Sequence, residues 1–168
     1  MKHSLPIKES EDAWLKEACI YPTVLSVKRL GLEAKKFLEE NFRGLVSLTI
    51  EVTEQEYINV NLDFTVYALK LLIMKNHARS MIKVNFSCDY SRFIIKVDTG
   101  IDLADDQSYT FKIYKVARDA GFSVTHTGSV MTLVAPLLRA HDLSIFTKRA
   151  EVSAIMAAFA RIFLGKKR

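Results

Sequence analysis

The sequence predicts an α/β fold, a two-layer sandwich in which a mixed β-sheet carries helices on one face. Stretches with an apolar residue at every second position are typical of half-buried strands, and they alternate along the chain with stretches whose apolar residues recur at helical spacing. The chain has 168 residues, the size of one ordinary domain, with 49% hydrophobic and 26% charged residues. Because no repeat or linker interrupts it, we expect a single domain over residues 1–168.

The N-terminal part of the chain predicts two helices. Ser10 is followed by two acidic residues, a typical helix start, and a short helix over residues 14–18 comes next. After Pro22, apolar residues recur at helical spacing with charged residues between them, which indicates an amphipathic helix. Its apolar positions are Val27, Leu30, Ala34, Phe37 and Leu38.

Two strands and a buried helix are expected next. Apolar and polar residues alternate over residues 46–52, and again over residues 58–62 after a polar turn, so we expect a hairpin. Asp63 stands where a carboxylate can cap the following helix. That helix runs to His77 and is apolar on most sides, which predicts that it is buried.

The second half predicts two more hairpins separated by a helix. Residues 82–86 and 93–97 alternate around a polar turn, and the helix over residues 109–120 ends at Gly121, a residue that readily closes a helix in the left-handed conformation. The last hairpin turns at Thr127-Gly128, and Pro136 ends its second strand.

A final helix is expected over residues 144–164, with an apolar stripe along one side. We expect the stripe to pack on its own domain, and a homodimer interface, a protein partner or an anionic membrane surface are the alternatives. The stripe consists of Val152, Ile155, Met156, Phe159 and Phe163.

The order of elements over about residues 24–137 resembles the GHKL superfamily, and within it the ATP-binding catalytic domain of histidine kinases. Asn76, at the end of the buried helix, resembles the family's magnesium-binding Asn, whose amide oxygen suits a hard cation. Asp98-Thr99-Gly100 resembles the box whose Asp accepts the adenine amino group and whose Gly lets the backbone approach the base. In the closing hairpin Ser129 replaces the usual Thr.

The resemblance implies a Bergerat-like histidine kinase ATPase fold, with residues 141–168 as an additional C-terminal helix. It also implies a nucleotide site, and the candidate residues for that site are Asn76, Asp98, Gly100 and Ser129.

Three departures from the family pattern concern the phosphate end of that site. Leu72 stands one helical turn before Asn76, where the family has Glu or Asn, and Asp102 replaces the family's second glycine. The long glycine-rich lid, whose backbone N–H groups cradle phosphate, is reduced to residues 101–108, which contain no glycine and three acids. Repulsion of a triphosphate follows from these charges.

We therefore expect a noncatalytic domain that acts in signalling or regulation by binding a protein, with a degenerate ATP site and no cofactor. The alternative is an ATP-binding protein of the anti-sigma-factor type or the histidine kinase type, with kinase-like activity and with Asn76 holding magnesium if ATP binds. A third hypothesis is a dimeric aspartic protease, because Asp98-Thr99-Gly100 also resembles its motif and two Asp98 carboxylates could share a proton. That fold, however, is nearly all β.

The net charge and the composition of the N-terminal residues bear on which partners the protein binds and in which compartment it lies. The net charge is +5, but the basic residues are interleaved with acids, so we expect no specific nucleic-acid binding. The first residues lack the apolar run of a signal peptide, and no stretch is long and apolar enough for a transmembrane helix. We expect a cytoplasmic protein whose partner is a signalling protein or a second copy. Cys19 and Cys88 lack ligand spacing and are expected to be buried free thiols.

Overall fold

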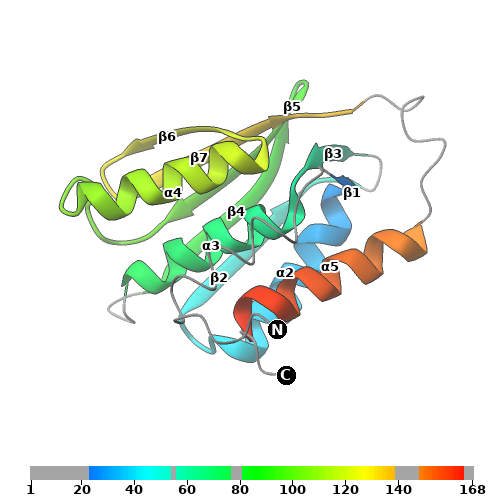
Figure 1. The fold of residues 1–168 in the computed structure, drawn as a ribbon, viewed down its shortest axis with the longest axis horizontal. Helices are drawn as coiled ribbons and strands as arrows, with labels where there is room; N and C mark the ends of the chain where they lie inside the picture. The colour runs from blue at the N-terminus through cyan, green and yellow to red at the C-terminus, as the bar shows by residue number, and fades with distance from the viewer. Residues whose placement is uncertain (1–22, 54–55, 77–80, 139–147, 165–168) are drawn as a thin grey trace, which may run out of the picture.

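The computed structural model describes residues 23–53, 56–76, 81–138 and 148–164, and within them it contains seven strands and four helices (Figure 1). The short helix expected over residues 14–18 and Cys19 lie outside the described residues. The long helices and the strands of the second half begin and end within a few residues of their expected bounds.

A five-stranded mixed sheet forms one layer, with the order β2-β4-β5-β7-β6. The first pair, β2 and β4, is parallel, and the other neighbours are antiparallel. The strands are β2 (Val46–Glu51), β4 (Ile82–Asp89), β5 (Arg92–Asp98), β6 (Ser123–Thr127) and β7 (Val130–Pro136). The strand β5 lies in the middle of the sheet.

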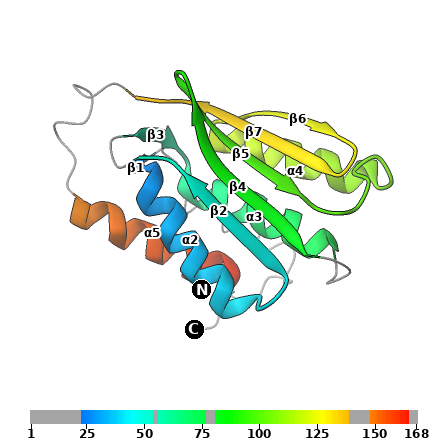
Figure 2. The same cartoon turned by 180° about the vertical axis from the view of Figure 1, so that it is seen from behind.

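The described helices lie on one face of this sheet, as the sequence predicts, and no described element covers the other face (Figures 1 and 2). They are α2 (Val27–Asn41), α3 (Leu62–Asn76), α4 (Gln107–Ala120) and α5 (Lys148–Phe163). The end of α4 was predicted correctly, because Gly121 follows it with a φ of 113° and donates its N–H to the carbonyls of Ala117 and Arg118.

The hydrophobic core lies between the sheet and the helices. Every second residue of β5 points into it, and Phe93, Ile95 and Val97 are all completely buried. Leu69 and Ile73 of α3 belong to the same buried cluster. Because the side chains of a strand alternate between faces, the residues between these three lie on the open face.

The hairpin expected from residues 46–62 does not form. The strand β3 (Tyr57–Val60) pairs with β1 (Thr23–Ser26) in a separate two-stranded sheet, and β2 pairs with β4 instead. Alternation along a strand identifies its buried face, but it does not identify its partner. A short polar stretch between two alternating segments predicts a hairpin loop, but here the two strands it connects belong to different sheets.

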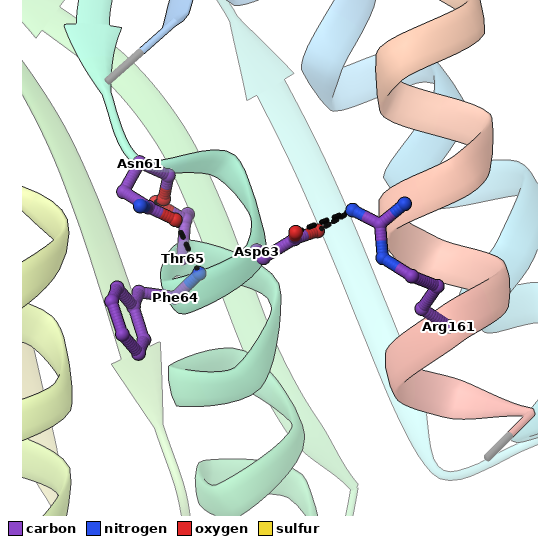
Figure 3. A network of polar contacts seen from close by, with 5 residues as sticks. All are labelled: Asn61, Asp63, Phe64, Thr65 and Arg161. Carbon is purple, nitrogen blue, oxygen red and sulfur yellow. Dashed lines mark hydrogen bonds and ion pairs between the residues drawn. The ribbon is translucent and has the colours of Figure 1, made fainter. Parts of the chain in front are cut away.

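The cap of α3 also differs from the expectation. Asn61 is the capping residue, and its side-chain oxygen accepts the N–H of Phe64 at 3.0 Å. Asp63 lies in the first turn, buried, and forms an ion pair with Arg161 of α5 (Figure 3). The carboxylate therefore joins two helices rather than capping one.

The last helix, α5, packs on its own chain, against α2 and α3. The rings of Phe159 and Phe163 contact Phe37 of α2, with centroid distances of 5.4 and 5.3 Å. At the start of α5, the buried carboxylate of Glu151 accepts the backbone N–H of Ser26. The expectation that the apolar stripe packs on its own domain is confirmed, although Met156 is 45% exposed.

Candidate functional site

The end of β5 and the turn between β6 and β7 bring three candidate residues together. The hydroxyl of Ser129 donates to Oδ1 of Asp98 at 2.7 Å, although the two residues are 31 positions apart. The backbone N–H of Gly100 donates to the same oxygen at 3.1 Å. The fourth candidate, Asn76, is the last residue of α3, and its side chain lies outside the described atoms.

Asp98 and Thr99 face opposite sides of the sheet. Asp98 follows the buried Val97, so by alternation it shares the open face with Ile94 and Lys96 and is half-buried there. The next residue, Thr99, is completely buried on the helix side. Its hydroxyl lies 2.9 and 3.0 Å from the carbonyls of Ile101 and Ser129. The sequence analysis identified Asp98 and missed Thr99. Because side chains alternate along a strand, the buried Val97 predicts that Thr99 is buried as well.

The loop between β5 and α4 is fastened by its own side chains. Leu103 is completely buried, and its N–H donates to the carbonyl of Gly128 at 2.9 Å. Two of the three acids accept local N–H groups, Asp102 from Ala104 and Asp106 from Tyr109, and the second of these bonds caps α4. These carboxylates shape the loop, and all three acids stay exposed.

Helix α4 lies directly against α3. The hydroxyl of Tyr109 donates to the carbonyl of Leu71 at 2.7 Å. Burial, with a smaller effect of Asp106, raises the pKa of Tyr109 to about 12, so this phenol stays protonated as a donor. One turn farther on, Lys112 lies over the ring of Tyr67, 5.9 Å from its centroid.

Leu72 is completely buried in the core. The resemblance places an acidic or amide side chain at this position in the family, close to the phosphates. Here the position contributes an aliphatic side chain to the packing of α3.

Other titratable groups lie away from these residues. Tyr114 of α4 and His126 of β6 are joined by a 2.7 Å hydrogen bond between the phenol oxygen and Nδ1, and burial raises the pKa of Tyr114. Cys88 is a half-buried free thiol whose pKa is raised to about 12 by burial and by the Glu56 carboxylate. Within the described part of the chain, no cluster of His, Cys, Asp or Glu could hold a metal ion.

Comparison with solved structures identifies the fold. The catalytic domain of the histidine kinase ThkA superposes with a TM-score of 0.51 at 15% sequence identity, over 70% of this chain and 97% of that domain. The fold is that of a histidine kinase catalytic domain. This confirms the fold that the resemblance in the sequence predicts.

Two further histidine kinase structures match with lower scores. The kinase AdeS of Acinetobacter baumannii gives a TM-score of 0.49 at 14% identity, over 79% of this chain and 77% of that one. The cytoplasmic segment of QseC gives 0.46 at 13% identity, over 80% and 97%. No known family's sequence model matches the chain. No curated protein matches it by sequence either.

No helix in the described ranges combines the length and the apolar character needed to cross a bilayer.

Proposed function

We propose that this chain is a noncatalytic domain with the histidine kinase fold, that it acts in signalling or regulation by binding a protein partner, and that its nucleotide site is degenerate. The identity of residue 72 is one support for this proposal. A general base must offer a proton acceptor within hydrogen-bond reach of the attacking water, and Leu72 offers none.

The observation that carries the proposal is the short connection between β5 and α4. Phosphoryl transfer depends on donors that stabilise charge on the phosphate oxygens, and a glycine-rich lid supplies them as backbone N–H groups. Here the carboxylates of Asp102 and Asp106 already accept two backbone N–H groups, one in the loop and one in the first turn of α4. Tyr109 then holds the start of α4 against α3. This part of the chain fits the phosphates of a nucleotide poorly.

The part of the site where the resemblance places adenine also differs from a site built to bind a nucleotide base. One oxygen of Asp98 already accepts two hydrogen bonds, from Ser129 and Gly100, and Asp98 lies on the open face. Residual affinity is therefore expected for a small planar ligand near Asp98 and Ser129, and it should not need magnesium.

Isothermal titration calorimetry with ATP, ADP and adenosine, each with and without magnesium, tests the proposal. We expect weak or undetectable ATP binding that is unchanged by magnesium, and no ATP hydrolysis. The matched variant is Asn76→Ala, which removes the one candidate magnesium ligand. Micromolar ATP binding that needs magnesium and disappears in this variant would overturn the proposal in favour of the kinase-type alternative.

The kinase-type alternative is favoured by one observation, the proximity of Asp98, Gly100 and Ser129 at the place where the resemblance puts the adenine site. The aspartic protease hypothesis has no comparable support. It requires a nearly all-β fold, whereas this chain has four helices over one face of a mixed sheet in its described ranges.

A further inference from the structure

The strand β2 forms one edge of the five-stranded sheet, and its outer side is a row of backbone donors and acceptors (Figure 2). The carbonyl of Leu45 accepts the N–H of Ile82, and β2 and β4 are parallel with Val46 beside Ile82. Because backbone groups alternate sides along a strand, odd-numbered residues of β2 bond to β4. The N–H and C=O groups of Val46, Leu48 and Ile50 therefore point away from the sheet.

None of the described residues pairs with that outer row. Edge strands are usually protected from pairing by lysine, proline or a bulge. The six residues of β2 include no lysine and no proline, and they pair with β4 without a bulge. The opposite edge strand, β6, contains one aliphatic residue, Val124, whereas β2 contains three.

The apolar side chains of β2 are incompletely covered. In β5 the core-facing residues are completely buried, but Val46, Leu48 and Ile50 are only half-buried. Helix α2 packs over β2 so closely that a Cβ at Gly31 would lie 3.1 Å from Ile50. The next residue of α2, Leu32, is 44% exposed. This edge thus combines free backbone groups with apolar surface, which a further strand would bury.

We propose that two copies of this chain pair through β2, antiparallel about a twofold axis at Thr49, and join their sheets into one. The twofold axis places Leu48 opposite the partner's Ile50. The N–H and C=O groups of both residues point outward, so the two residues can exchange hydrogen bonds. Val46 lies opposite the partner's Val52 on the same apolar face, which continues across the interface.

Charges on the open face agree with this register. The same axis places Ser47 opposite the partner's Glu51, and Thr49 opposite the partner's Thr49. Like charges directly opposite each other destabilise an antiparallel pair, and this register places no like charges opposite each other along the strand. The occupant of the edge is thus a second copy of β2, matched by its own sequence.

This pairing goes beyond the proposed function and does not depend on it. The interface involves the edge strand β2, whereas Asp98 and Ser129 lie on β5 and beside β7. Dimerisation is expected to be equal with and without ATP, so failure of the dimer and failure of the degenerate-site proposal are separate results.

Sedimentation equilibrium over a wide range of protein concentration tests the dimer with the full chain. We expect a reversible monomer–dimer equilibrium. Leu48→Pro removes an outward N–H without removing a bond to β4, so it should leave the monomer folded and raise the dissociation constant about tenfold or more. Leu48→Val, which keeps the N–H, should change the dissociation constant little.

A charge pair at residue 47 tests the register. Ser47→Glu places two glutamates opposite each other across the axis and should raise the dissociation constant several-fold, whereas Ser47→Lys places Lys opposite the partner's Glu51 and should lower it. Within one copy, Ser47 lies beside Lys83, so the two substitutions should change monomer stability in the opposite order. A wild-type monomer at all concentrations, a dimer that persists unchanged in Leu48→Pro, or equal effects of both charges would overturn the proposal.

Discussion

Tyr90 is the first of the two residues in the turn between β4 and β5, and its backbone has a φ of 58°. Among the described residues, it is the only one other than glycine with a positive φ. Two-residue hairpin turns require a positive φ at one or both central positions, and glycine is preferred there because it has no Cβ. The ring is 96% exposed, so it forms little packing to offset the cost of this conformation.

Replacing this tyrosine with glycine should stabilise the domain. The left-handed conformation costs a residue with a Cβ about 1–2 kcal/mol, and glycine avoids this cost at the expense of some unfolded-state entropy. We expect Tyr90→Gly to gain about 1 kcal/mol and to raise Tm by about 2–4 °C. Thermal unfolding followed by circular dichroism measures it. Tyr90→Phe, which keeps the Cβ and the ring, should leave Tm unchanged, and a lower Tm in Tyr90→Gly would contradict the explanation.

In the sequence, only the order of the family's motifs carries long-range information about the candidate site. The order of motifs placed Asp98 and Ser129 in one site, and the two side chains do form a hydrogen bond. Local pattern alone could not connect residues 31 positions apart. The motif match did not identify the buried Thr99. A motif compares residue types, whereas the face on which a strand residue lies depends on whether its position is odd or even.

At the scale of elements, the ion pair between Asp63 and Arg161 holds α5 to the start of α3 (Figure 3). Asp63 is 6% exposed in its side chain, so the pair with Arg161 neutralises a nearly buried carboxylate, and removal of the guanidinium weakens that neutralisation. A second contact, from Lys70 to the carbonyl of Ile162 at 3.1 Å, joins the same two helices.

We expect Arg161→Met to lower the free energy of unfolding by on the order of 2 kcal/mol. The matched control is Arg92→Met, which removes an exposed ion pair with Asp89 and should cost about 0.5 kcal/mol or less. Urea unfolding of both variants gives the comparison. Equal losses for the two variants would show that the Asp63–Arg161 pair contributes no more than a surface pair.

Strands and helices were easier to predict than strand partners. Periodicity identified β2 to β7 and all four described helices, because each buries one face. It overlooked β1, which has only four residues, and it joined β2 to β3 because they are neighbours in sequence. The parallel pairing of β2 with β4 depends on α3 crossing between them, a tertiary property that no local pattern contains.

For the whole molecule, two raised pKa values predict loss of stability in alkali. The Cys88 thiol and the Tyr109 phenol ionise near 9.0 and 10.0 in an unfolded chain, and near 12 in the folded protein. Between these values the folded state binds more protons than the unfolded state, so stability falls as pH rises from about 9 to about 12. Well below pH 9 both groups are protonated in the folded and the unfolded state, so neither contributes a slope there.

The double variant Tyr109→Phe, Cys88→Ala separates this effect from general alkaline unfolding. It should be less stable at neutral pH, because the bond to Leu71 is lost, but its stability should decline less steeply above pH 9. Urea midpoints measured at neutral and alkaline pH for both proteins test this. Parallel declines would assign the alkaline loss to other groups.

The attachments of α5 also determine when the chain can finish folding during synthesis. Its contacts join residues 125 positions apart, from Ser26 to Glu151, and 98 positions apart, from Asp63 to Arg161. A ribosome adds roughly 5–20 residues per second and releases the N-terminal part first. The surfaces of α2 and α3 around Phe37 therefore meet water, or another nascent chain, for seconds before their cover is made. Premature termination before residue 148 would make that exposure permanent, so a truncated product should be a target for chaperones and proteases.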